Sequence, residues 1–108
     1  MRRGLDRGED APVFVQVASY RLGSGSTAEL ARRIEQGNLP VIRAIPGFVA
    51  YYAFETADAV VASVLLFESA SGVEEAEKRL AGWIEDVVEQ FDVEPLAVLE
   101  GEVIASST

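Results

Sequence analysis

The stretch that decides the fold is Val60-Val61-Ala62-Ser63-Val64-Leu65-Leu66-Phe67-Glu68. Apolar residues occupy both alternating sides of this stretch from residue 60 to residue 67, and Ser63 is the one polar residue among them. A strand with one wet face would alternate apolar and polar residues, so this pattern predicts a central strand that is buried on both faces. A buried helix segment is the alternative, but the stretch is short for a helix and its valine content favours a strand.

Length, charge and composition limit the possible functions. The chain has 108 residues and a net charge of −9, which predicts one domain with a modest core and disfavours nucleic acid or an anionic membrane as partner. It contains no cysteine and no histidine, so thiolate sites, disulfides and the commonest general base are excluded. No apolar run approaches the ~20 residues that span a bilayer, and no apolar segment follows Arg2-Arg3. We expect a cytoplasmic protein.

The first half of the chain predicts an arm, a strand and an interrupted helix. Residues 1–11 are polar and charged and are expected to form a flexible N-terminal arm before a single domain over residues 12–108. A strand is predicted over residues 13–20, and Ser26 and Glu29 have the spacing of a capping box. The helix that follows over residues 28–36 is interrupted by Gly37 and Pro40, and its spacing resumes over residues 41–45. We therefore expect a kinked helix or two short ones.

The second half predicts three strands and one long amphipathic helix. Strands are expected over residues 48–55, over the stretch quoted above and over residues 96–99, with a further extended piece over 102–105. Apolar residues at helical spacing predict a helix over residues 73–90. The order β-α-β-β-α-β is that of the α+β, ferredoxin-like fold, a four-stranded antiparallel sheet with two helices on one face.

Several short motifs in this order resemble the antibiotic-biosynthesis-monooxygenase-like (ABM-like) domains of the dimeric α+β barrel superfamily. The resemblance covers roughly residues 13–106 and rests on Gly23-Ser24-Gly25, Leu39-Pro40, Pro46-Gly47-Phe48 leading into Tyr51-Tyr52, Leu66-Phe67-Glu68-Ser69 and Gly101-Glu102-Val103. It implies a two-subunit barrel with a pocket in each subunit between the sheet and the helices. The best-known members of the family oxidise aromatic polyketides without a cofactor or degrade haem. Haem ligation of the usual kind is excluded here, because the chain has no histidine.

The large aromatic side chains are the candidates for a ligand pocket. The residues expected to line it are Trp83, Tyr51, Tyr52, Phe67 and Tyr20. Trp83 falls on the apolar stripe of its helix, so core packing is the alternative to a place on a pocket wall. Adjacent residues of a strand face opposite sides, so at most one of Tyr51 and Tyr52 can line a given pocket. We expect this pocket to be mainly apolar and to lie between the second helix and the sheet.

The remaining polar candidates have simpler explanations. Asn38 is the only asparagine, and its position beside Gly37 favours a cap or turn role over a family-type catalytic one. Arg21 and Arg43 could bind an anion, but surface solvation is the more economical interpretation. Glu68, Glu100 and Glu102 could form a carboxylate site for Mg²⁺ or Ca²⁺, although their spacing matches no metal loop. We expect no metal and no cofactor.

Two functions from different classes remain. The first is a cofactor-independent monooxygenase that acts on an apolar aromatic small molecule, as the resemblance implies. The second is a non-catalytic small-molecule-binding or assembly domain, which the lack of histidine and of any general-base constellation favours.

The strands also predict an assembly. Two helices can cover only one face of a four-stranded sheet, yet the predicted strands are apolar on both parities. The uncovered face of a monomer would be a large contiguous apolar patch, which soluble monomers rarely expose. We therefore expect a homodimer joined through its sheet faces, with the segment past Gly101 crossing to the partner. The alternative is that this segment folds back over its own sheet.

Overall fold

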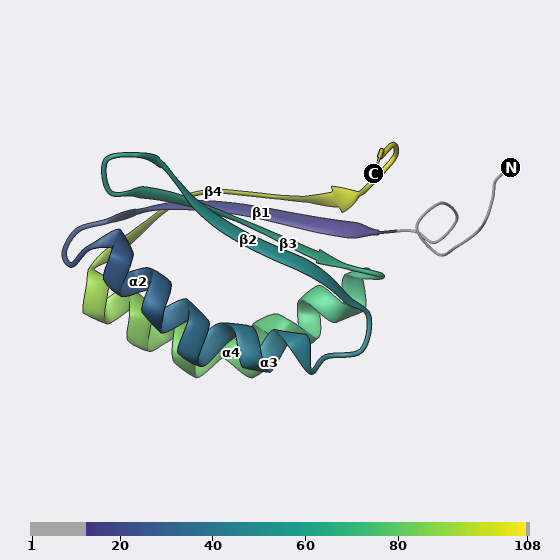
Figure 1. Ribbon diagram of the computed structural model, residues 1–108, viewed down its shortest axis with the longest axis horizontal. Coiled ribbons are helices and arrows are strands. Elements are labelled where there is room, and N and C mark those ends of the chain that lie inside the picture. The colour runs from purple at the N-terminus through teal and green to yellow at the C-terminus, as the bar shows by residue number, and fades with distance from the viewer. Residues whose placement is uncertain (1–12, 108) are drawn as a thin grey trace, which may run out of the picture.

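The computed structural model describes residues 13–107 (Figure 1), so the predicted arm over residues 1–11 lies outside the described residues. The elements are, in chain order, β1 (Phe14–Leu22), α2 (Thr27–Arg33), the π-helical segment η1 (Ile34–Asn38), α3 (Leu39–Arg43), β2 (Phe48–Ala57), β3 (Val60–Phe67), α4 (Ala70–Phe91) and β4 (Val93–Glu102). The order of strands in the sheet is β2-β3-β1-β4, and each neighbouring pair is antiparallel. The ferredoxin-like α+β fold predicted from the sequence is confirmed, and β3 is an interior strand.

Element ends differ from the sequence-based boundaries where backbone pairing overrides local sequence. β1 continues to Leu22, whose amide donates to the carbonyl of Ala59, and β2 continues to Ala57. β4 begins at Val93 rather than Leu96 and ends at Glu102, because it pairs with β1 along the whole length of β1. α4 begins at Ala70 rather than Val73. Its first turn includes Gly72, which lies against the ring of Phe67.

The interrupted first helix is one nearly continuous helical path that contains a π turn. Ser26 caps α2 and forms the predicted capping box with Glu29. The five residues of η1 then join α2 directly to α3, and Pro40 stands in the first turn of α3, where its missing amide hydrogen costs no helical hydrogen bond. The prediction of a kinked helix or two short helices is therefore right about the two helices and missed the π turn between them.

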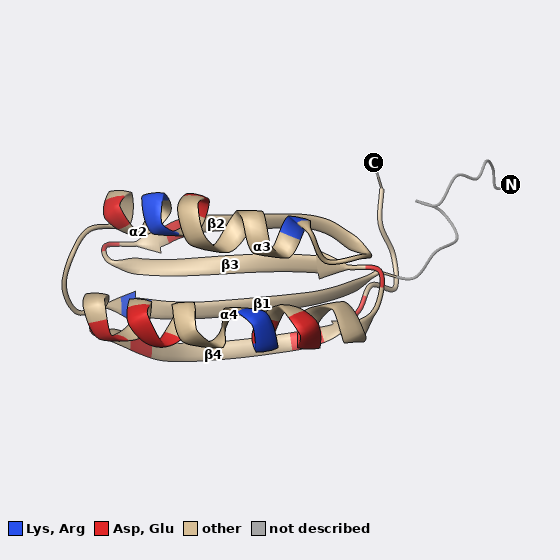
Figure 2. Cartoon of the chain, turned by 90° about the horizontal axis from the view of Figure 1, so that it is seen from below, with Lys and Arg blue, Asp and Glu red and all other residues tan. Residues whose placement is uncertain are grey.

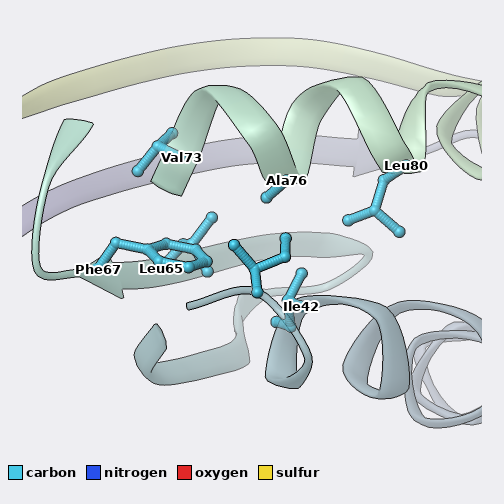
Figure 3. Packing of buried hydrophobic residues seen from close by; sticks show 7 residues of the cluster. Ile42, Leu65, Phe67, Val73, Ala76 and Leu80 are labelled. Atoms are coloured by element: carbon cyan, nitrogen blue, oxygen red, sulfur yellow. The ribbon is translucent and has the colours of Figure 1, made fainter. Parts of the chain in front are cut away.

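One core lies between the helices and the sheet. Figure 3 shows Val73, Ala76 and Leu80 of α4 pointing toward Leu65 and Phe67 of β3, with Ile42 of α3 completing the cluster. Phe67 is fully buried, and its ring meets that of Phe48 edge to face with 5.7 Å between centroids. A second cluster continues this core toward the other end of the sheet and contains Leu22, Leu30, Ile34, Val61, Val87 and Phe91. Trp83 packs against both clusters.

The other face of the sheet carries no helix of the described chain (Figure 1). The strand register places on this open face Val15 and Val17 of β1, Ala50, Tyr52 and Phe54 of β2, Val64 and Leu66 of β3, and Leu99 of β4. Tyr52 is 62% exposed, Phe54 51% and Leu99 71%. The open face is therefore a broad apolar surface within residues 13–107.

Charge is concentrated on the helical side. In Figure 2, Asp and Glu positions outnumber Lys and Arg positions on α4, whereas β1 and β3 are almost free of charged residues. Arg79 and Glu75 of α4 form an i,i+4 ion pair at 2.7 Å. The part of the chain that the structure describes contains no helix that is long and apolar enough to cross a membrane.

The contact between Gly72 and Phe67 gives a direct test of the core. A Cβ at Gly72 would lie 2.3 Å from Cδ1 of Phe67, whose ring is buried and cannot move aside. We expect Gly72→Ala to lower the free energy of unfolding by roughly 1–3 kcal/mol, the usual cost of overpacking. Gly82→Ala, in the same helix, is the matched control, because nothing lies within 4 Å of its Cβ position.

The control should raise the free energy of unfolding by up to about 1 kcal/mol, since alanine is the better helix former. Urea unfolding followed by far-ultraviolet circular dichroism measures both variants. Equal stability of the two variants would contradict the packing described here.

Candidate functional site

A cavity of about 340 Å³ lies between α4 and the sheet, within the roughly 300–1,000 Å³ range of small-molecule sites. The sheet provides residues from all four strands, and the helices provide residues from α2, η1, α3 and α4. Most of the wall is aliphatic, and the apolar lining residues are Ala18, Leu30, Ile42, Leu65, Ala76, Leu80, Ile84, Val87, Val88, Val93, Pro95 and Val98. Ile84, Val88 and Val98 are themselves more than 40% exposed, so the cavity opens between α4 and β4.

Two tyrosines and a serine form a polar group on the sheet side of the cavity. Tyr20 of β1, Tyr51 of β2 and Ser63 of β3 all line it. Burial raises the pKa of the Tyr51 hydroxyl, the nearby Tyr20 raises it further, and a side-chain hydrogen bond with Ser63 partly opposes the shift. Burial also raises the pKa of Tyr20. Both phenols therefore stay protonated at neutral pH, so each keeps a hydroxyl hydrogen that it can donate.

Trp83 and Asn38 supply polar atoms from the helical side. Trp83 of α4 and Asn38 of η1 both line the cavity, and Asn38 is only 7% exposed. The indole Nε1 of Trp83 and the Oδ1 of Asn38 are buried and have no hydrogen-bond partner in the described chain. Such groups cost roughly 1–3 kcal/mol each when they stay unpaired, so their place on a cavity wall needs an explanation.

The interpretation of Asn38 as a cap or turn residue is wrong. It stands at the N-cap position of α3 but makes no side-chain cap hydrogen bond there, and its side chain is buried. The physical reason is the π turn, which shifts the helical register so that Asn38 lies on the inward side together with Ile34 and Ile42.

A polar clamp closes one end of the cavity. The Nε2 of Gln16 on β1 donates to Glu77 of α4 at 2.9 Å and to Glu100 of β4 at 2.7 Å, and Gln16 and Glu77 line the cavity. Glu77 is the one charged residue among the described residues that line the cavity, and its carboxylate is engaged with Gln16 at the exposed end. The interior is therefore a neutral, mainly apolar environment.

The structure brings together three of the five aromatic candidates and separates the other two. Tyr20, Tyr51 and Trp83 line the cavity. Tyr52 faces the open side of the sheet, because adjacent strand residues point to opposite faces. Phe67 lies on the helical face but is fully enclosed in the core, so its ring does not reach the cavity. Tyr52 and Phe67 are therefore corrected to surface and core residues, whereas ligand binding by the other three stays a prediction.

The charged candidates lie apart from the cavity wall. Arg21 pairs with Glu94 at 3.1 Å on the surface, and Arg43 is exposed at the end of α3. Among the candidate carboxylates, Glu100 binds Gln16, and neither Glu68 nor Glu102 is on the cavity wall. Within residues 13–107, no group of three or more His, Cys, Asp or Glu side chains is placed to hold a metal ion.

Sequence reasoning missed five polar residues of the cavity: Gln16, Ser19, Asn38, Ser63 and Glu77. A signal for Asn38 exists in the sequence. Leu30, Ile34, Asn38 and Ile42 are spaced by four residues, and the three apolar members are buried in the structure. Ser63 also carried a signal, as the one polar residue in the apolar run of the central strand.

No protein-family model and no curated protein matches the sequence. Solved structures do match. A protein of unknown function from Nitrosomonas europaea, NE2512, has 16% identity and a TM-score of 0.73, with 91% of this chain and 95% of that chain covered. A Deinococcus radiodurans protein named a "putative antibiotic biosynthesis monooxygenase" has 12% identity and a TM-score of 0.67, with coverage of 88% and 96%.

SnoaB from Streptomyces nogalater, a cofactor-independent oxygenase, has 14% identity and a TM-score of 0.63, with coverage of 91% of this chain and 97% of that one. This chain has the ABM-like fold. The likeness covers nearly the whole domain and confirms the resemblance seen in the sequence at the level of fold. At these identities it does not carry over a substrate or an active-site residue.

The buried phenols predict a pH dependence. Burial raises the pKa of the Tyr51 hydroxyl above its ordinary value of 10.0, so above that pH the folded state keeps a proton that the unfolded chain loses. The free energy of unfolding should be insensitive to this group below pH 10 and should fall as the pH rises further. Tyr51→Phe should show a shallower fall than the wild-type chain in urea unfolding between pH 9 and 11. Equal slopes would contradict the burial of this hydroxyl.

Proposed function

We propose that this ABM-like protein is a small oxygenase that acts without a cofactor on an apolar aromatic molecule. The observation that carries the proposal is the cavity itself: it is aliphatic, large enough for a small ring system, and has the neutral phenols of Tyr20 and Tyr51 on its sheet side. The fold shared with SnoaB supports the same class of reaction.

The residues of the cavity suit such a reaction in two ways. The aliphatic wall takes up a planar apolar ring and excludes water, which strengthens every hydrogen bond made inside. The Tyr51 hydroxyl can donate to the carbonyl oxygen of an anthrone enolate, which forms when the conjugated CH₂ carbon loses a proton to bulk water, and can stabilise the negative charge on that oxygen. An anthrone balances the chemistry without another reductant: its CH₂ carbon is oxidised to a carbonyl by O₂, and the second oxygen atom leaves as water.

Oxygen uptake with anthrone as substrate tests the proposal. We expect turnover above buffer for the wild-type chain and a loss of about 10²-fold in kcat/KM for Tyr51→Phe, the usual effect of removing one donor to a developing oxyanion. Tyr52→Phe is the matched control, because it removes the adjacent hydroxyl on the opposite face of the sheet. No uptake above buffer across a panel of anthrones and quinols would overturn the oxygenase proposal.

The second candidate function is the binding of a small molecule without its chemical conversion. The observation that favours it is the absence of a buried titratable base on the cavity wall formed by residues 13–107, where Glu77 is engaged with Gln16 at the exposed end. An aromatic molecule that copurifies and stays unchanged during prolonged aerobic incubation would support this function over catalysis.

We also propose that the protein is a homodimer joined through the open faces of its sheets. The proposal is supported by the breadth of this apolar surface and by the last described residues, which leave it uncovered: Ile104 is 98% exposed. A second copy would bury the same residues on both chains under twofold symmetry. The crossing of the segment past Gly101 to the partner is part of the same proposal.

Light scattering coupled to gel filtration tests the dimer. We expect a dimer mass for the wild-type chain at micromolar concentration and a monomer mass for Tyr52→Glu, because the interface would bury an unpaired carboxylate. Ala81→Glu adds the same charge on the exposed side of α4 and should stay a dimer. A monomer mass for the wild-type chain would overturn the proposal, and circular dichroism checks that both variants are folded.

A further inference from the structure

Two unsatisfied polar atoms of opposite character lie at one end of the cavity. The Nε1 of Trp83 is a hydrogen-bond donor only, and the Oδ1 of Asn38 is an acceptor; both are buried without a partner in the described chain. They come from different helical elements, α4 and η1, yet both residues line the same cavity. A ligand group that accepts one hydrogen bond and donates another would satisfy both of these buried atoms.

Gly37 leaves room for the indole of Trp83. A Cβ added to Gly37 would lie 2.3 Å from Nε1 and 2.5 Å from Cδ1 of Trp83. The indole N–H therefore rests directly against the residue that precedes Asn38. A side chain of any size at position 37 would displace the indole from this place.

The π turn provides the other half of the arrangement. η1 ends at Asn38, and its extra residue turns Asn38 inward, where the side chain is 7% exposed on the cavity wall. π turns inside helices are uncommon and are found frequently at functional sites. Here the turn brings Asn38 to the cavity wall, and the glycine before it leaves room for the indole of Trp83, which lines the same cavity.

We propose that Asn38 and Trp83 form a subsite for a single neutral group that both donates and accepts a hydrogen bond, such as the hydroxyl of an aromatic ligand. The hydroxyl donates its hydrogen to Oδ1 of Asn38 and accepts from Nε1–H of Trp83. An ether oxygen cannot donate. A carboxylate cannot donate either and would enter a cavity whose described wall carries no lysine or arginine. The inference rests on the proposed function only in requiring that the cavity binds an aromatic ligand; it requires no turnover.

Calorimetric titration of the full chain with four naphthalene probes at neutral pH tests the subsite. We expect 1-naphthol to bind at least tenfold more tightly than 1-methoxynaphthalene and naphthalene, and 1-naphthoate to bind most weakly. Equal affinities for 1-naphthol and 1-methoxynaphthalene would overturn the inference, as would tightest binding of 1-naphthoate or no binding of 1-naphthol. Equal affinities are also the result expected if an ordered water fills the subsite permanently.

Variants test which side chains cause the preference for 1-naphthol over 1-methoxynaphthalene. Asn38→Leu removes the acceptor at similar volume, and Gly37→Ala displaces the indole; both should reduce the preference for 1-naphthol over 1-methoxynaphthalene to less than twofold. Gln36→Leu is the matched control, because it removes an exposed amide from the same π turn and should keep the full preference. Trp83→Phe removes only the donor and decides the matter if Asn38→Leu does not fold. A preference that survives both Gly37→Ala and Trp83→Phe would overturn the assignment.

This binding assay separates the two proposals. A preference for the hydroxyl-bearing probe that depends on Asn38 or Trp83, together with no oxygen uptake, would support the subsite and contradict the oxygenase proposal. Oxygen uptake together with equal affinities for 1-naphthol and 1-methoxynaphthalene would contradict the subsite and support the oxygenase proposal.

Discussion

Four helical segments must cover four strands from one side, and this constraint determines which face of the sheet is covered and which is open. α4 packs against β3 and α3 through Val73, Ala76 and Leu80, and α2 with η1 and α3 completes the layer over β2 and β3. β4, at the edge of the sheet, is only partly covered by α4, and Val98 in its middle is 60% exposed. The cavity opens at this edge.

The same constraint explains why the sheet has two apolar faces with different roles. The face under the helices gives residues to the core and to the cavity, whereas the open face keeps aliphatic and aromatic side chains in solvent in the isolated chain. Tyr51 and Tyr52 show the division within two residues, because one hydroxyl is held beside Ser63 and the other ring is exposed. For these two residues the partition follows from strand alternation, whereas a register shift in β2 places Phe48 and Ala50 on opposite faces although they are two residues apart.

The π turn between α2 and α3 reconciles the spacing of the inward residues with the geometry of a helix. In an α-helix, each step of four residues advances about 40° beyond a full turn, so a stripe at residues 30, 34, 38 and 42 would rotate away from the core. The wider π turn takes up part of this rotation. Leu30, Ile34, Asn38 and Ile42 consequently all stay buried, and a polar residue becomes part of an otherwise apolar stripe.

The fold could be predicted from the sequence because its determinants are local and periodic. The doubly apolar run at residues 60–67, the capping box at Ser26 and the amphipathic spacing of α4 each indicate one element. The cavity could be predicted only in part, because parity places Tyr51 and Tyr52 on opposite faces without deciding which face the helices cover. Phe67 faces the helices, but its distance from the cavity depends on packing around Gly72. Asn38 depends on a π turn, for which Gly37 and Pro40 suggested only a break in the helix.

Trp83 is the single tryptophan of the chain, and it stands on the cavity wall beside two of the three tyrosines. The tryptophan fluorescence of the protein therefore originates from the cavity wall. The emission maximum of this indole depends on how much water surrounds it. Tyr20 and Tyr51 can transfer their excitation energy to the same indole. The molecule thus carries a built-in optical probe of its own interior that needs no added label.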